Sequence, residues 1–145
     1  MQNLILESTN KEAGWLKDFR KKSFESFNNL PLEQSSIFTK YTDENSLNLE
    51  RFSQNVKKPG EIPEYLKDSD GITLIRNGSD VFISEISPEL KRSGIIFTDI
   101  ITAIEKYPNL IKKCILDNMK NESKLESFNS AFFSGGIFLY VPKNV

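Results

Sequence analysis

The sequence of 145 residues contains no histidine and a single cysteine, Cys114. Without histidine, the chain lacks the commonest general base and the commonest metal ligand of proteins. A Ser-His-Asp or Cys-His catalytic site therefore cannot be built from it, and a zinc site would depend almost entirely on carboxylates, which is uncommon. One cysteine also excludes an internal disulfide and a metal site made of several thiolates. We expect no catalytic, cofactor-binding or metal-binding residue, and no enzyme.

An excess of one charge and long apolar runs are also missing. Lys and Arg number 19 and Asp and Glu number 20, a formal net charge of −1 that gives no case for binding nucleic acid or an anionic membrane. No apolar run approaches the ~20 residues that span a bilayer. The first seven residues lack the basic start of a signal peptide. We expect one globular domain of a soluble protein.

The N-terminal third contains an amphipathic helix. Residues 9–12 fit a capping box, and Asn28 to Pro31 end the helical pattern. Arg20 follows the apolar stripe, and we expect it to form a structural ion pair or carboxylate clamp. Residues 1–10 are predicted to be a short arm and residues 43–70 a polar surface loop. The stripe that packs on the core consists of Trp15, Leu16, Phe19, Ser23 and Phe27.

The middle of the chain predicts a small antiparallel sheet. Asn77-Gly78 lies between two β-prone runs within residues 72–86, which is typical of a hairpin with a type I′ turn. Pro88 starts a turn or short helix, and residues 94–97 supply a third strand. Thr98 or Asp99 then caps a helix.

Pro108 interrupts this helix, which then resumes and runs to residue 116. Cys114 falls on the apolar face of the resumed helix, at i+3 from Ile111. We expect it to pack in the core, since an iron–sulfur cluster requires several thiolates.

Residues 125–145 predict a helix that is followed by a glycine pair and a strand. Leu125, Phe128 and Phe132 share one helix face, and Gly135-Gly136 is predicted to end that helix in left-handed geometry. This Gly-Gly pair precedes a strand, so we interpret it as a backbone corner and not as a phosphate loop. The run from Ile137 to Val141 is typical of a strand buried on both faces.

Residues 128–143 resemble the point where SufB and SufD proteins enter their core domain, with the pattern "lN-x-A-x-f-x-x-G-x-f-x-y-v-P-k". The hairpin, the Gly94-Ile95-Ile96 strand and the following helix occur in the family's order. The expected Trp-x-Tyr-Thr element is matched only in part, with Phe38 at the Trp position. SufD is the closer likeness. An N-terminal signature of the family is matched by Trp15, Leu16, Phe19, Arg20, Phe27, Leu30, Pro31 and Leu32.

The resemblance implies that residues 1–132 form the N-terminal α+β domain of a SufD-like protein. Residues 133–145 would then begin its core, which in the family is a right-handed parallel β-helix. It further implies a non-catalytic accessory role in iron–sulfur cluster assembly in the cytoplasm, with SufB and the SufC ATPase as partners. The family's functional cysteine and histidine positions and its SufC-binding region find no match here. Structural roles are expected for the motif residues Trp15, Arg20, Pro31, Gly94, Asn129, Gly135, Gly136 and Pro142.

The terminal strand has no evident partner in the sequence. We expect it to be disordered, folded back onto the N-terminal arm, or paired across a homodimer, because an exposed strand edge is a template for pairing. A central place in a finished sheet would count against the scaffold interpretation. The alternative function is a free-standing protein-interaction domain, unrelated to iron–sulfur assembly, that uses its hairpin edge or aromatic helix.

Overall fold

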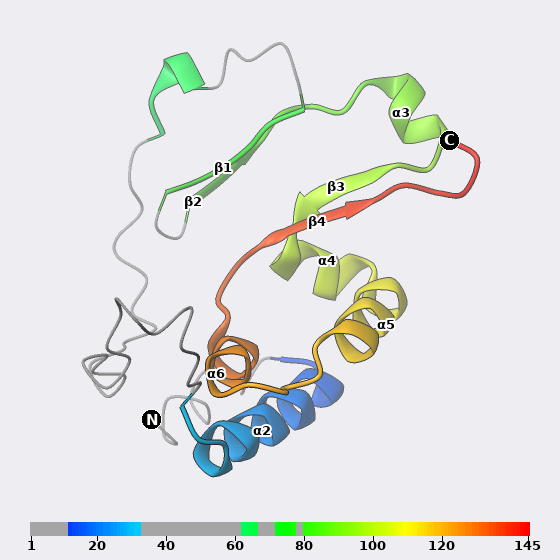
Figure 1. The fold of residues 1–145 in the computed structure, drawn as a ribbon. Coiled ribbons are helices and arrows are strands. Elements are labelled where there is room, and N and C mark those ends of the chain that lie inside the picture. Colours follow the sequence, from blue (N-terminus) through cyan, green and yellow to red (C-terminus); the bar gives the residue numbers. More distant parts are fainter. Residues whose placement is uncertain (1–11, 33–61, 67–71, 78–79) are drawn as a thin grey trace, which may run out of the picture. The chain divides into compact units, whose positions relative to one another are not determined.

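The computed structural model describes residues 12–32, 62–66, 72–77 and 80–145 (Figure 1). The chain divides into two compact units, one made of residues 1–54 and 112–133 and the other of residues 55–111 and 134–145. We call these the helical unit and the sheet unit. The predicted arm, most of the predicted capping box and most of the predicted polar loop lie outside the described residues; a 3-10 helix, η4 (Glu64–Leu66), falls within that loop.

The helical unit is built on the pairing of α2 (Gly14–Asn29) with α6 (Lys124–Phe132). The predicted apolar stripe of α2 is confirmed, with Trp15 half-buried and the other four residues buried. The facing side of α6 buries Ser127, Ser130 and Ala131 with no exposed surface at all. Such small side chains let two helix backbones approach closely. The large volume comes from an aromatic cluster of Phe24, Phe27, Phe128 and Phe132.

Two buried hydroxyl groups in this pair bond to their own helices, whereas the buried Ser130 hydroxyl has no hydrogen-bond partner among the described residues. The Ser23 hydroxyl donates to the Phe19 carbonyl at 2.9 Å, and the Ser127 hydroxyl donates to the Ser123 carbonyl at 2.7 Å. These bonds remove the cost of burying an unpaired polar group.

The two ends of α2 differ in how their backbone groups are satisfied. Helix α2 begins at Gly14, with Ala13 at the N-cap position and no side-chain cap. At its other end, the Lys124 ammonium donates to the carbonyls of Phe27 and Leu30 at 2.6 and 2.8 Å. A cation at a helix C-terminus also stabilises the helix dipole.

The sheet unit contains two small antiparallel sheets, so the prediction of a single sheet was wrong. The predicted hairpin is confirmed as β1 (Leu74–Asn77) and β2 (Asp80–Ile83). The strands pair Asn77 with Asp80, so Asn77 is the last residue of β1 and the prediction that it is a central residue of the turn was wrong. Residues 78 and 79 lie outside the described part of the chain.

The second sheet pairs β3 (Ile96–Asp99) with β4 (Ile137–Tyr140), strands that are about forty residues apart (Figure 1). The expectation that the terminal strand would find no partner within its own domain was therefore wrong. So was the expectation of burial on both faces. Thr98 and Phe138 are paired and buried on the face that α4 covers, whereas Ile137 and Leu139 are 60% and 59% exposed.

The helices of the middle region begin where the sequence predicts. Pro88 is the first residue of α3 (Pro88–Arg92), and Asp99 caps α4 (Ile100–Lys106). After Tyr107 the chain continues as α5 (Pro108–Asn118). Among the residues that the structure describes, no helix has both the length and the apolar character needed to cross a membrane.

Two local predictions were wrong for identifiable reasons. Helix α6 ends at Phe132 and leaves through Phe133 in an extended conformation, and neither Gly135 nor Gly136 has a positive φ. Cys114 is exposed, because the buried side of α5 is the narrow line of Ile111 and Ile115.

Candidate functional site

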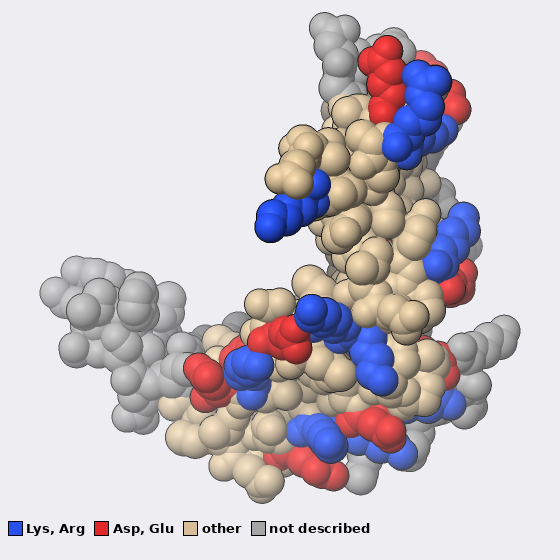
Figure 2. Space-filling view, turned by 90° about the vertical axis from the view of Figure 1, so that its right-hand side faces the viewer, with Lys and Arg blue, Asp and Glu red and all other residues tan. Residues whose placement is uncertain are grey.

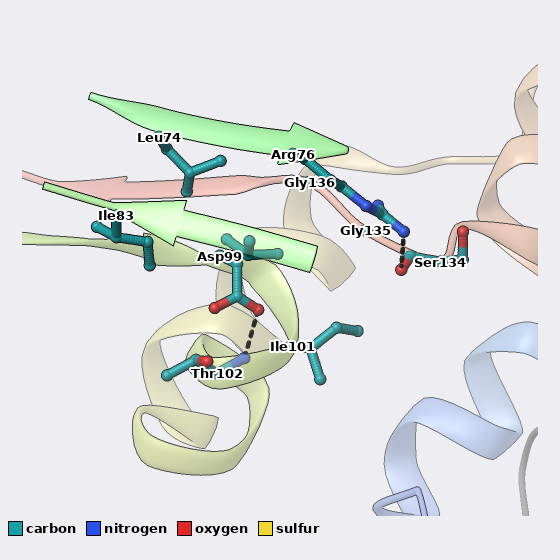
Figure 3. A pocket seen from close by; sticks show the side chains of 10 residues that line it. Leu74, Arg76, Ile83, Asp99, Ile101, Thr102, Ser134, Gly135 and Gly136 are labelled. Atoms are coloured by element: carbon teal, nitrogen blue, oxygen red, sulfur yellow. Dashed lines mark hydrogen bonds between the residues drawn. The ribbon is translucent and has the colours of Figure 1, made fainter. Parts of the chain in front are cut away.

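The sheet unit contains a hollow of about 490 Å³ that begins at one face of the hairpin (Figure 3). Strand side chains alternate between the two faces of a sheet. The pairing of Leu74 with Ile83 and of Arg76 with Val81 places these four side chains on the same face, which lines the hollow. We call this space the hairpin hollow. Its hairpin wall is apolar except for Arg76.

The opposite wall comes from two other segments of the same unit. One is the junction of β3 and α4, where Asp99, Ile101 and Thr102 line the hollow; the other is the connection from α6 to β4, residues 134–136. The amide of Ile100 donates to the Gly136 carbonyl at 3.0 Å and ties these two segments together. The hollow is thus formed by parts of the chain that are distant in sequence.

Arg76 is held beside the Gly-Gly pair. Its Nη2 donates to the Ser134 carbonyl at 3.1 Å, as the dashed line in Figure 3 shows. A Cβ atom on Gly135 would overlap the guanidinium group, so glycine at this position leaves the space that Arg76 fills. This explains the glycine without any left-handed backbone.

Asp99 is the acidic side chain of the hollow, and it works as a helix cap. Its carboxylate accepts from the Thr102 amide at 2.9 Å. Burial alone would raise the pKa of Asp99, but hydrogen bonds from the side chain and amide of Thr102 and from nearby amides outweigh it and lower the pKa. The carboxylate therefore stays ionised at neutral pH as a structural group.

Gly94 and Pro142, two of the predicted motif residues, lie next to each other in the sheet unit. Gly94 has a φ of +85° and follows the C-terminus of α3. Its amide donates to the Lys91 carbonyl and that of Ile95 to the Leu90 carbonyl, which is a Schellman motif. A Cβ on Gly94 would also lie 3.1 Å from Pro142 Cγ.

Arg20 holds the C-terminus of α6 in the helical unit. Its side chain is 3% exposed and forms an ion pair with Glu12 at 3.1 Å, as the sequence leads one to expect. Its Nη1 donates to the Ala131 carbonyl and its Nη2 to the Phe133 carbonyl, both at 2.9 Å, and its guanidinium lies 4.2 Å from the centroid of the Phe133 ring. Every one of these contacts is structural in character.

The other motif residues do not gather into a site. Trp15 is half-buried in α2, and its indole nitrogen has no hydrogen-bond partner among the described residues. Pro31 is exposed after α2, and Asn129 is exposed on α6. Four of the eight predicted residues, Trp15, Arg20, Pro31 and Asn129, belong to the helical unit, and the other four belong to the sheet unit.

The described residues show no group of three or more acidic, cysteine or histidine side chains arranged to hold a metal ion. Lys and Arg are interspersed with Asp and Glu on the face that Figure 2 shows. That surface pattern agrees with the near balance of charges in the sequence.

Comparison with known proteins decides the family. The model of the SufBD protein N-terminal region matches residues 5–145. The chain belongs to the SufBD family. The resemblance seen in the sequence is thereby confirmed. No solved structure gives a significant match.

The relatives of this SufBD chain are longer proteins. It is 31% identical over 145 residues to the iron–sulfur cluster assembly protein SufD of Bacillus subtilis (strain 168), an alignment that covers 92% of this chain and 33% of the relative. It is 30% identical over 167 residues to an iron–sulfur cluster assembly SufBD family protein of Staphylococcus aureus (strain USA300), covering 99% and 35%. The chain thus spans about a third of the length of the curated relatives it matches.

Several residues that define these sites were missed in the sequence. Arg76 interrupts an apolar run, and the alternation of strand side chains places it on the same face as Leu74. A charged side chain on that apolar face was a signal that could have identified Arg76. Ser123 to Glu126 has the spacing of a capping box, S-x-x-E. The Ser123 side chain does accept from the Glu126 amide at 3.2 Å. Nothing local marks Ser134 as the acceptor for Arg76, which is 58 positions away.

Proposed function

We propose that this chain is the N-terminal accessory domain of a SufD-like scaffold subunit in iron–sulfur cluster assembly. The observation that carries the proposal is the match of residues 5–145 to the N-terminal region of SufBD proteins. The names of the relatives, which are iron–sulfur cluster assembly proteins, supply the process. The domain acts in the cytoplasm with SufB-type and SufC-type subunits, and ATP hydrolysis belongs to SufC.

The domain is non-catalytic in this proposal. A chain with no histidine and one cysteine has few groups suited to proton transfer or cluster ligation. The cysteine is exposed on α5, and the hydrogen bonds of Arg20 to the carbonyls of Ala131 and Phe133 hold the end of α6. In this proposal the domain contacts the rest of the subunit and its partner proteins.

The exposed apolar side chains of β4 support the proposal that the chain continues from this strand into a further domain. Ile137, Leu139 and Val141 are 60%, 59% and 50% exposed and form one apolar stripe. The pairing in the described residues leaves β4 at the edge of a two-stranded sheet, not at its centre. We infer that residues 133–145 begin the core domain and that the stripe packs against its next segment, in the family a parallel β-helix. A homodimer through β4 is the competing arrangement.

Co-purification tests the function. The tagged chain, extended to the full length of its gene, is co-expressed with the SufB-type and SufC-type proteins of the same genome. We expect a stable complex by size-exclusion chromatography. The absence of both proteins from the eluted fraction would contradict the proposal and favour a protein-interaction domain of another pathway.

A second experiment tests whether another segment packs on β4. Amide hydrogen exchange compares the 145-residue chain with the full-length gene product. We expect the amides of 137–141 to be protected more strongly in the longer protein, because a neighbouring segment covers the edge. A concentration-dependent dimer of the 145-residue chain, with protection of β4 only in the dimer, would instead support the homodimer.

A further inference from the structure

The hairpin hollow offers apolar side chains and peptide groups to a ligand. Its volume of about 490 Å³ falls within the range of roughly 300–1,000 Å³ that is typical of ligand pockets. One wall is the apolar face of the hairpin, and Ile101 adds apolar surface from the opposite side (Figure 3). All the residues that line it belong to the sheet unit. Burial of apolar surface is therefore the main gain that a ligand obtains here.

The two charged side chains that line the hollow, Arg76 and Asp99, have opposite signs, and both are engaged within the chain. Arg76 donates to the Ser134 carbonyl, and Asp99 accepts from the amide of Thr102 as the cap of α4. A cationic ligand would meet the guanidinium and an anionic ligand would meet the ionised carboxylate, so a charge of either sign is opposed by one of them. The hollow therefore favours an uncharged ligand.

The connection from α6 to β4 supplies backbone groups to the hollow. Gly135 and Gly136 have no side chains, so they line the hollow with backbone atoms. The Gly136 carbonyl accepts from the amide of Ile100, but the amides of the two glycines have no hydrogen-bond partner among the described residues. The carbonyl of a bound peptide can replace water at these donors, as main-chain hydrogen bonds do where extended peptides are recognised.

We propose that the hairpin hollow binds an uncharged peptide segment that carries one large apolar side chain. The side chain lies against Leu74, Val81 and Ile83, and the peptide groups beside it bond to Gly135 and Gly136. The site is independent of the proposed function, since it depends only on the geometry of the sheet unit. Failure of this proposal would leave the co-purification experiment unaffected.

The test is a nuclear magnetic resonance titration of the ¹⁵N-labelled 145-residue chain. The probe is N-acetyl-leucine N-methylamide, an uncharged leucine with a peptide group on each side. Binding on the order of 1–10 mM is expected for a ligand of about thirteen non-hydrogen atoms. We expect saturable shifts at the amides of residues 74, 81, 83 and 101, and the largest shifts at Gly135 and Gly136. Shifts that do not saturate, or that lie outside the hollow, would overturn the proposal.

Two matched ligands separate the apolar contact from the hydrogen bonds. N-acetyl-alanine N-methylamide keeps both peptide groups, and we expect it to bind about tenfold more weakly because most of the apolar side chain is missing. Isoamyl alcohol keeps the branched apolar body without the peptide groups, and loss of a hydrogen bond should weaken its binding by about fivefold. Equal affinity of the leucine and alanine ligands would contradict the role of the apolar wall. Equal affinity of the alcohol would assign the hollow to hydrocarbons and overturn the assignment to peptides.

Charged ligands test the preference for an uncharged side chain. The N-acetyl N-methylamides of glutamate and lysine keep the same two peptide groups and carry a negative or a positive side chain. We expect both to bind more weakly than the leucine ligand at low ionic strength, since each meets a like charge in the hollow. Binding of either one as tightly as the leucine ligand would overturn the proposal. These comparisons use the unchanged chain and do not depend on the folding of any variant.

The variant Val81→Thr tests the hairpin wall. It keeps the branched shape and replaces one methyl group with a hydroxyl at a position that is 38% exposed, so we expect it to fold. Binding of the leucine ligand should weaken by about fourfold, the effect of one methyl group lost from apolar contact. Val145→Thr, at an exposed residue that does not line the hollow, is the matched control and should bind as the unchanged chain does. Equal affinity of the two variants for the leucine ligand would contradict the proposal.

Discussion

In the helical unit, the buried faces of α2 and α6 meet each other, and the aromatic cluster between them includes Phe132, which is 2% exposed. In the sheet unit, β4 buries Phe138 but leaves Ile137 and Leu139 more than half exposed. One unit has a partner for its apolar face within the chain, and the other presents part of its apolar surface to solvent. Buried residues such as Phe132 stabilise the domain, whereas exposed apolar residues such as Ile137 and Leu139 are available for contact with another segment or protein.

The two units also use arginine differently. Arg20 is buried and surrounded by carbonyl oxygens and a carboxylate, whereas Arg76 is exposed at the rim of a hollow. A buried charge is strongly destabilising to unpair. An exposed charge contributes little to stability. We therefore expect substitution of Arg20 to lower the stability of the chain more than substitution of Arg76.

The largest expected effect is on the two buried phenylalanines, one from each unit. Phe132→Ala should cost about 4 kcal/mol of unfolding free energy, because truncating a buried aromatic leaves a cavity. Phe138→Ala should cost less, about 2 kcal/mol, since β4 is covered on one face only. Urea denaturation measures both. Equal losses would show that the sheet unit is as well packed as the helical unit.

Hydrogen exchange of the same variants tests whether the units unfold separately. We expect Phe132→Ala to speed exchange in α2 and α6 more than in β3. A uniform increase across both units would mean that they unfold as one cooperative domain.

The second effect concerns the Arg20 clamp. Arg20→Met should destabilise the chain by about 3 kcal/mol, since it leaves the Ala131 carbonyl and the Glu12 carboxylate without their donor. The control is Arg92→Met on exposed α3, which should change stability by less than about 0.5 kcal/mol. A loss for Arg20→Met no larger than that of the control would show that the clamp contributes nothing to stability.

The third effect is at the glycine of the Schellman motif. Gly94→Ala should cost about 1–2 kcal/mol, because an L-residue is strained at φ +85° and its Cβ would crowd Pro142. Gly14→Ala is the matched control. Position 14 is helical and has no atom within 4 Å of an added Cβ, so alanine there should be neutral or stabilise by up to about 1 kcal/mol. Thermal unfolding of both variants gives the comparison, and equal effects would exclude the backbone argument.

The sequence was sufficient where the cause of a structure lies within a few residues. The stripe of α2, the start of α3 at Pro88, the cap of α4 at Thr98 or Asp99 and the break at Pro108 follow from local spacing and side-chain chemistry. The pairing of β3 with β4 could not be predicted this way, because the partner of a strand depends on the path of the chain between them. The family resemblance predicted the family but not this pairing.

The exposure of individual side chains was the second property that the sequence predicted poorly. Periodicity shows which residues share a helix face, but the width of the buried part depends on what packs against it. Cys114 lies within one turn of Ile111 and Ile115 and is nevertheless exposed. The same holds for Gly135, whose role comes from Arg76, a residue of another segment. Long-range contacts of this kind determine the hollow, and no local pattern reports them.

The smallest expected effect is a pH dependence in the helical unit. The Glu126 carboxylate accepts from the amides of residues 120, 121 and 122 at 2.9–3.1 Å. Burial would raise the pKa of Glu126, but these amides outweigh burial and lower it.

A lowered pKa in the folded state gives stability that is complete above the unfolded pKa of about 4.3 and is lost as the pH falls through the folded pKa. Glu126→Gln should therefore cost roughly 0.5 kcal/mol at pH 7, the size of a helix-cap contact, and progressively less below pH ~4. Urea denaturation of both proteins between pH 7 and pH 3 gives this difference directly. Because the bonds to Glu126 order the loop that leads into α6, a difference that stays constant with pH would mean that the loop is held by its backbone geometry and not by the charge.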